Sequence, residues 1–169
     1  MLIYTNNTKI TLFIWLIALL IIQNHSSRMA YAVPGGIPGV CDSIARITKL
    51  SDLGFGAMLV DYAGSLNIDT NDGATTVGGV NRFGGAIRSS RFAIRGCPNK
   101  AYTIILPDVA TISSASASMN VDRFVSNPSV GLLDPNGNQE LAVGARLNIA
   151  TSQPPGDYSG SFPIEVVFE

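Results

Sequence analysis

The chain has 169 residues, of which 46% are hydrophobic and 14% charged, and its formal net charge is −1. A weakly acidic chain has no general electrostatic affinity for nucleic acid or anionic lipid, so neither is expected as a partner. The length accommodates one domain of ordinary size.

The first 32 residues are predicted to be a secretory signal peptide. Lys9 precedes an apolar run over residues 11–22, and the segment ends in Ala30-Tyr31-Ala32. A positive start, a short apolar run and an A-x-A ending are typical of a cleaved signal peptide. The run is shorter than the about 20 apolar residues that span a bilayer, and an uncleaved anchor is the alternative. We therefore expect an exported chain in the periplasm, at the cell surface or outside the cell, with no transmembrane anchor after cleavage.

Residues 33–42 form a Gly/Pro-rich segment, predicted to be a flexible lead-in, and residues 43–169 are predicted to form a single domain. Both cysteines, Cys41 and Cys97, are retained after cleavage. Exported chains meet oxidising conditions, and an even cysteine count without metal-like spacing predicts one disulfide. Two free buried thiols are the alternative.

Short extended segments follow one another through the first half of this domain. Residues 43–50, 53–60 and 65–69 are rich in β-branched or alternating apolar residues, which predicts strands. Thr70-Asn71-Asp72-Gly73 is a hairpin turn signal, so residues 74–80 are predicted to form the return strand. Glycine pairs flank residues 80–83, which we expect to form a loop or an irregular edge.

The second half continues the same pattern. Residues 91–95 alternate, and residues 102–106 form the most apolar run after the leader, which predicts a central, well-buried strand. Residues 113–118 are predicted to be a loop of small residues, and a strong turn follows at 134–137. A second core strand is predicted from five apolar residues at strict period two: Leu141, Val143, Ala145, Leu147 and Ile149.

The last segment, residues 158–168, also has apolar or small residues at every second position. Side chains on a strand alternate between faces, so this pattern predicts one face packed in a core. Pro163 offers no N–H to a ladder and favours an edge or near-edge strand, or a strand start. The predicted packing face consists of Tyr158, Gly160, Phe162, Ile164, Val166 and Phe168. Many short alternating runs, broken by Gly, Pro and Asn, predict an all-β sandwich for the whole domain.

No pattern of residues supports an enzyme, a cofactor or a metal site. The only histidine, His25, is lost with the leader, which removes a Ser-His-Asp or Cys-His site and the usual zinc ligands. A Ser-Lys pair would need Lys49 or Lys100, and no motif places a serine beside either. The stretch 69–73 resembles a calcium loop, but its glycine comes one position early and the glutamate is missing, which favours a plain turn.

Charge is unevenly distributed along the domain. Residues 73–107 contain five basic residues and no acid, whereas residues 134–169 contain five acids and one base. This distribution fits cross-strand pairing or solvated faces within one domain. The alternative is head-to-tail complementarity between copies.

Several motifs together resemble one known group: Asp52-Leu-Gly-Phe-Gly56, Arg95-Gly-Cys-Pro-Asn99, Leu133-Asp-Pro-Asn-Gly137 and Gly156-Asp-Tyr-Ser-Gly160. Over most of the mature chain, the sequence resembles a bacterial family of secreted domains of unknown function. That family is similar to fimbrial, pilin-like subunits and is related in pattern to spore coat protein U domains. The ending P-G-x-Y-x-G-x-F is its most specific motif.

The resemblance implies an immunoglobulin-like, antiparallel β-sandwich that is exported to the periplasm. It implies a structural or adhesive subunit, pilin-like, that is assembled at the bacterial surface by strand addition. Its partners would be neighbouring copies of itself, or a periplasmic chaperone and an outer-membrane usher. Residues 33–40 depart from the pattern of a donor strand, because they contain two prolines and three glycines. The alternative function is a self-contained secreted β-sandwich binding module that recognises a sugar or a host surface.

Overall fold

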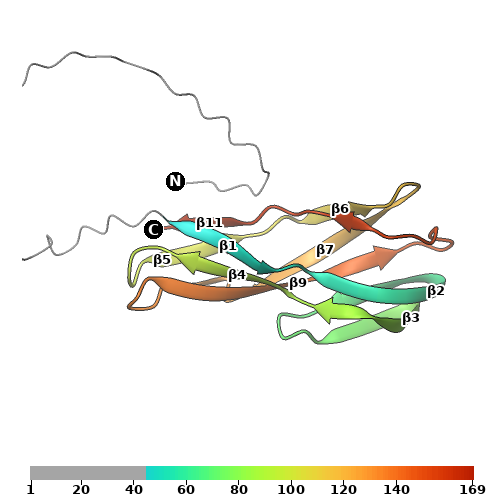
Figure 1. Ribbon diagram of the computed structural model, residues 1–169, viewed down its shortest axis with the longest axis horizontal. Helices are drawn as coiled ribbons and strands as arrows, with labels where there is room; N and C mark the ends of the chain where they lie inside the picture. Colours follow the sequence, from blue (N-terminus) through green and yellow to red (C-terminus); the bar gives the residue numbers. More distant parts are fainter. Residues whose placement is uncertain (1–44) are drawn as a thin grey trace, which may run out of the picture.

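The computed structural model describes residues 45–169 (Figure 1). The predicted signal peptide, residues 1–32, and the predicted lead-in, residues 33–42, lie outside the described residues and stay predictions. The strands run roughly along the long axis of the described part and form two facing layers (Figure 1).

Eleven β-strands and no helix make up the regular structure of residues 45–169. Every strand pair is antiparallel. The prediction of an all-β, antiparallel β-sandwich is therefore confirmed. The strands are β1 (Arg46–Ser51), β2 (Gly54–Ile68), β3 (Ala74–Arg88), β4 (Ser90–Arg95), β5 (Ala101–Ile105), β6 (Val109–Ser113), β7 (Ser118–Asn127), β8 (Val130–Leu132), β9 (Asn138–Ile149), β10 (Ser159–Gly160) and β11 (Glu165–Phe168).

Strand β9 is the centre of the larger sheet. Its residues 138–143 pair with β4 and its residues 145–149 pair with β2 along one edge, while β7 pairs along the other edge. The order is β1-β4-β9-β7-β6-β10, with β2 and β3 continuing outward from β9. Strand β9 buries one side chain in two on the inner face, as period two requires. These are Leu141, Val143, Ala145, Leu147 and Ile149, the residues of the predicted second core strand.

The β2–β3 hairpin is folded back on itself. Residues 64–68 of β2 pair with β9 in the larger sheet, whereas residues 54–60 pair with β3 alone. A register shift between Val60 and Gly64 marks the bend at which the hairpin turns back. The folded-back half covers the inner face of the larger sheet and packs on one core cluster: Val80, Val121, Ala145, Leu147 and Ile149. The hairpin therefore contributes to both layers of the sandwich.

Two glycines allow the β2–β3 hairpin to bend back on itself. Gly78 has a φ of 77°, a conformation that L side chains rarely adopt, and a Cβ there would meet the carbonyl oxygen of Ala63. At Gly79, a Cβ would lie 2.5 Å from the backbone nitrogen of Tyr62. A side chain at either position would push the two strands apart.

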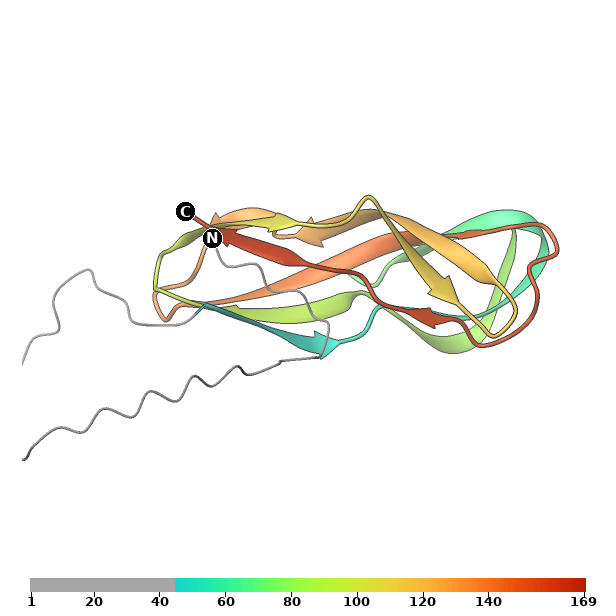
Figure 2. The same cartoon turned by 90° about the horizontal axis from the view of Figure 1, so that it is seen from above.

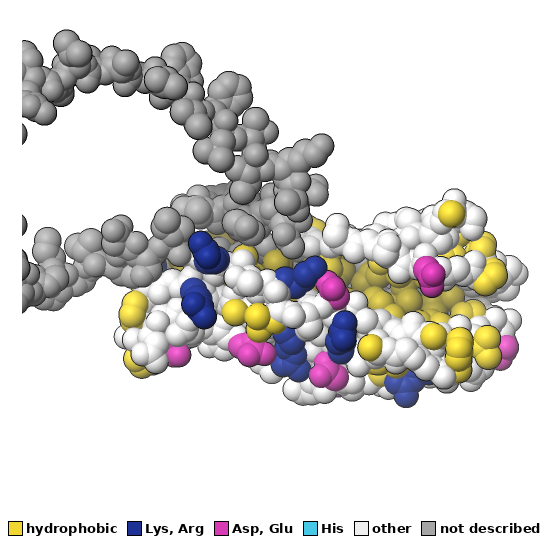
Figure 3. All heavy atoms as spheres, viewed as in Figure 1, with side chains coloured by type: hydrophobic (Ala, Val, Ile, Leu, Met, Phe, Trp, Pro, Cys, Tyr) yellow, Lys and Arg dark blue, Asp and Glu magenta, His cyan; other side chains and the backbone are white. Residues whose placement is uncertain are grey.

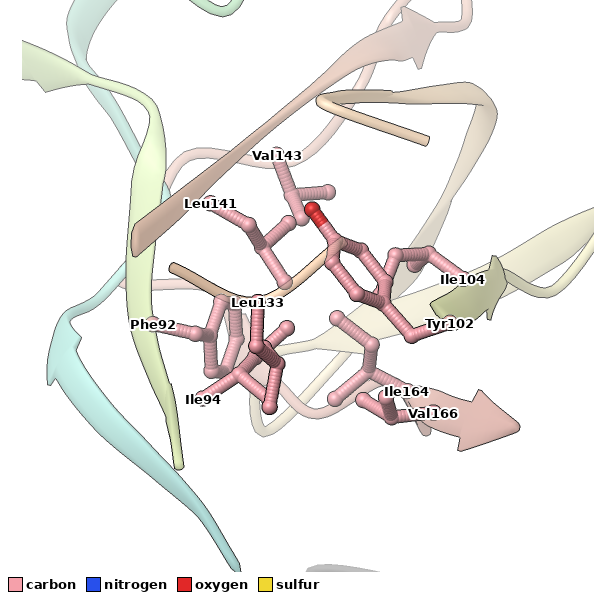
Figure 4. Packing of buried hydrophobic residues seen from close by; sticks show 9 residues of the cluster. All are labelled: Phe92, Ile94, Tyr102, Ile104, Leu133, Leu141, Val143, Ile164 and Val166. Carbon is pink, nitrogen blue, oxygen red and sulfur yellow. The ribbon is translucent and has the colours of Figure 1, made fainter. Parts of the chain in front are cut away.

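A three-stranded sheet, in the order β11-β5-β8, covers the other half of the inner face. Its inner residues pack against β4 and β9 in a second cluster (Figure 4): Phe92, Ile94, Tyr102, Ile104, Leu133, Leu141, Val143, Ile164 and Val166. Burial raises the pKa of the Tyr102 hydroxyl, which has no hydrogen-bond partner within residues 45–169.

Residues 80–83, expected to form a loop or an irregular edge, lie in β3, which pairs with β2 alone and with register shifts, so the irregular edge is what the structure has. Two other details differ from the sequence predictions. The run 102–106 forms the central strand of the small sheet but is covered on one face only, so that Ile105 is 48% exposed. The segment 158–168 is not one strand: it forms β10 in the larger sheet, crosses over, and forms β11 in the smaller sheet.

We expect Gly78→Ala to lower the free energy of unfolding by about 2 kcal/mol, because it adds backbone strain and a steric clash at the fold. Gly84→Ala in the same strand is the control, since a Cβ at Gly84 meets nothing within 4 Å. Urea unfolding of both variants measures the difference. Equal stability of the two would show that the hairpin does not depend on a tight fold at Gly78.

Candidate functional site

One long side of the sandwich is bordered by two chain segments that lie at sheet edges. Strand β1, an edge of the larger sheet, continues into the folded-back half of β2, so the first border is residues 46–60. The second border is residues 159–168, where β10 is an edge of the larger sheet and β11 an edge of the smaller one. The two borders lie side by side and run in opposite directions (Figure 2). We call the region between them the open side.

The backbone of β11 has hydrogen-bonding groups that point toward the open side. The N–H of Glu169 donates to the carbonyl oxygen of Ala101 at 3.1 Å. Together with the register of β11 and β5, this bond shows which residues of β11 direct their backbone groups toward β5 and which direct them away. In an antiparallel pair, every second residue directs its N–H and C=O away from the partner strand. In β11 these residues are Val166 and Phe168, and no strand among residues 45–169 pairs with that edge.

Strand β1, on the opposite border, also has backbone groups that point toward the open side. The N–H of Gly96 donates to the carbonyl oxygen of Gly137 at 2.8 Å, so every second residue of β4 directs its backbone groups toward β9. The residues between them direct theirs toward β1. The backbone groups of Ile47 and Lys49 then point away from β4, toward the open side. Both borders therefore offer unpaired donors and acceptors within the described part of the chain.

Half-buried apolar side chains lie beneath these edges. Figure 3 shows hydrophobic side chains uncovered between β2 and the β6–β10 edge. Seven such residues pack around the cluster in this half: Leu53, Phe55, Met58, Val60, Ile112, Met119 and Phe124. In the other half, Ile47, Phe162 and Phe168 play the same part. The described residues thus cover the core incompletely along the open side.

Phe162 lies between the two core clusters. Its ring centroid is 4.9 Å from that of Phe124 in a tilted contact and 6.4 Å from that of Phe92 in an edge-to-face contact. Such aromatic pairs contribute about 0.5–1.5 kcal/mol beyond the area they bury. Phe162 therefore anchors the crossing from β10 to β11 in the middle of the open side.

A hydrogen-bonded latch fixes the place where β1 passes into β2. Asp72, in the turn of the β2–β3 hairpin, accepts from the backbone N–H of Ser89 at 2.6 Å and from its hydroxyl at 2.7 Å. The Ser90 hydroxyl donates to the carbonyl oxygen of Ser51 at 2.7 Å. The hairpin turn, the start of β4 and the end of β1 are thereby joined, which positions one border of the open side.

The latch also sets the electrostatics of Asp72. The hydrogen bond from the Ser89 hydroxyl, followed by that from the Ser89 backbone, holds the pKa of the Asp72 carboxyl below its usual value. Arg91 adds an ion pair, with its guanidinium nitrogen 3.4 Å from the carboxylate oxygen. The ionised carboxylate is therefore the form that the folded structure favours.

The predicted C-terminal packing face is divided among three environments. Ile164 and Val166 are buried in the core, and Phe162 and Phe168 pack against it half-buried. Tyr158 lies in the loop before β10, where its hydroxyl donates to the carbonyl oxygen of Pro154 at 2.6 Å. Gly160 lies in β10, where a Cβ would meet the carbonyl oxygen of Thr111. The alternating face thus extends from Phe162 to Phe168.

Cys97 follows β4 and is disulfide-bonded. Cys41 lies outside the described residues, so the pairing of Cys41 with Cys97 stays a prediction.

The stretch 69–73 forms a hairpin turn. The Asp69 carboxylate accepts from the backbone N–H groups of Asn71 and Gly73 at 2.7 and 2.8 Å. Within residues 45–169, no group of three or more His, Cys, Asp or Glu side chains could hold a metal ion. The same part of the chain contains no helix that is long and apolar enough to span a membrane.

We expect Asp72→Ala to destabilise the protein at pH 7, because it removes both hydrogen bonds to Ser89. Since the folded pKa of Asp72 lies below its unfolded value of about 3.9, its contribution is complete above that value and is lost as the pH falls through the folded pKa. Urea midpoints of wild type and variant should converge between about pH 4 and pH 2. Asp108→Ala, at an exposed position after β5, is the control; a pH-independent difference for Asp72→Ala would contradict the latch.

The comparisons with known proteins give one match. No curated protein matches the chain. No solved structure matches it either. The model of the domain of unknown function DUF4402 matches residues 46–168, from the start of β1 to the end of β11. Since that match covers nearly the whole described domain, both borders of the open side included, the chain belongs to the DUF4402 family.

Proposed function

We propose that this chain is an exported structural or adhesive subunit, pilin-like, that accepts a β-strand from a neighbouring chain along the open side. The observation that carries the proposal is the edge of β11. Its Val166 and Phe168 combine outward-pointing backbone groups with side chains in or against the core. An added strand would extend the ladder and cover the half-buried apolar residues at the same time.

The arrangement defines the kind of strand that would fit. Strands β1 and β11 run in opposite directions (Figure 2), so an added strand is parallel to one and antiparallel to the other. Alternate side chains of that strand would face Ile47 and Phe162 and should be apolar. The partners that supply such a strand would be another copy of the chain or a periplasmic chaperone acting with an outer-membrane usher.

The first test is refolding of the full chain after expression for export in bacteria. We expect polymers, or material that stays soluble only with a co-expressed chaperone, because the described domain leaves apolar side chains uncovered along the open side. Size exclusion with light scattering measures the result. A monomer that refolds alone at every concentration would contradict strand addition and favour the self-contained binding module.

A pair of proline variants tests the edge itself. Val166→Pro removes an N–H that points to the open side and leaves the ladder with β5 intact, whereas Val167→Pro removes an N–H that bonds to Thr103. We expect Val166→Pro to abolish polymer formation or chaperone binding with a smaller drop in melting temperature than Val167→Pro. Unchanged association of Val166→Pro in the same light-scattering assay would exclude the β11 edge as the point of addition.

A further inference from the structure

The outer face of the three-stranded sheet is apolar and uncovered by the described residues. Ile105 is 48% exposed, Val130 62% and Leu132 61%. The pairing register places Val130 beside Thr103 and Thr103 beside Val167, in one row across the sheet. Ile105 lies one step along β5 on the same face, so these side chains are contiguous. A contiguous apolar area of this kind marks an interaction site more often than single exposed side chains do.

Two acids flank this apolar face. Glu165 pairs in register with Ile105, and Glu169 follows the end of β11 opposite Ala101. Both alternate with Val166 and Phe168 and so point outward, away from the core. Neither makes an ion pair with a side chain among residues 45–169. Strand β11 therefore presents the outward sequence Glu165, Val167 and Glu169.

The outer face of the larger sheet carries the complementary pattern. Strand β4 buries Phe92 and Ile94 and directs Arg91, Ala93 and Arg95 outward. Arg46 of β1 lies directly opposite Arg95, a repulsive pair for which no carboxylate partner is present within the described range. Glu140 of β9 lies beside Ala93, and Asp72 forms an ion pair with Arg91 at 3.4 Å, so these two acids offset part of the charge. The face keeps an excess of positive charge at the Arg46–Arg95 end.

The two faces match in spacing as well as in charge. Four residues along a strand span about 13 Å, so Glu165 and Glu169 are as far apart as Arg91 and Arg95. Between them lie Val167 on one face and Ala93 on the other. Packed sheets stand about 10 Å apart, close enough for the outward side chains of the two strands to meet.

We propose that the outer face of the β11-β5-β8 sheet binds the outer β1–β4 face of a second copy of the chain. The two faces lie on opposite layers of one molecule, so the contact is heterologous and repeats from copy to copy. The contact uses side chains on sheet faces and no strand edge. It is therefore independent of strand addition along the open side, and the two modes together would join copies in two directions.

Sedimentation velocity of the full exported chain tests the proposal. We expect concentration-dependent self-association at about 0.01 M ionic strength, where charges act over about 30 Å, and loss of its salt-dependent part at about 1 M, where they act over about 3 Å. Association through strand edges does not depend on charge and would persist at both ionic strengths. Glu165→Lys with Glu169→Lys should weaken self-association at least about tenfold, and so should Arg46→Glu with Arg95→Glu, two residues that lie opposite each other and outside the latch. Mixing the two double variants should restore it, because each then meets opposite charge.

Asp108→Lys with Asp157→Lys is the matched control for Glu165→Lys with Glu169→Lys, since it makes the same change in net charge at exposed positions outside the strands of both faces. A wild type that stays monomeric at low salt would overturn the proposal, as would double variants that associate like wild type or a mixture that gains nothing. Val130→Thr with Leu132→Thr gives a second readout, since both side chains are exposed and can change without loss of the core. That variant should also weaken association. Normal association would exclude the apolar face as the contact.

Discussion

The structure depends on one constraint: the backbone of β9 must be paired along both edges while every second side chain is buried. Strands β4 and β2 share one edge of β9 in succession, and β7 takes the other. As a result, two different elements pack on the inner face of the larger sheet. The three-stranded sheet packs over Leu141 and Val143, and the folded-back hairpin packs over Leu147 and Ile149. The same division into two covers produces the open side, because each cover ends at its own edge.

The open side and the outer faces serve different physical roles. Along the open side, unpaired backbone groups at Val166 and Phe168 lie above half-buried apolar side chains, a combination that a strand satisfies. On the outer faces, backbone groups are already paired and only side chains remain to interact. The strand proposed for the first surface would have to match it in chain direction and in the alternation of its side chains. The second copy proposed for the outer faces would have to match them in charge and in the position of apolar residues.

The latch at Asp72 connects the fold to the open side. A hairpin turn that is far from β1 in the sequence fixes the passage from β1 into β2 through Ser89 and Ser90. Since residues 54–60 pair with β3 alone, their position depends on this latch and on the tight fold at Gly78. Strand pairing with β4 and β3 thus holds one border, while the core packing of Phe162 and Val166 holds the other.

The sequence by itself determined the all-β class, the buried face of β9 and the apolar alternation from Phe162 to Phe168, because period two follows from local backbone geometry. Pro163 also favoured an edge or near-edge strand, or a strand start, and it lies two residues before β11. Only the tertiary structure decided that the last segment divides between two sheets, that β2 folds back, and that Ile105 faces outward. These features depend on which strands pair across long sequence separations. Alternation sets the two faces of a strand but does not identify what covers each face.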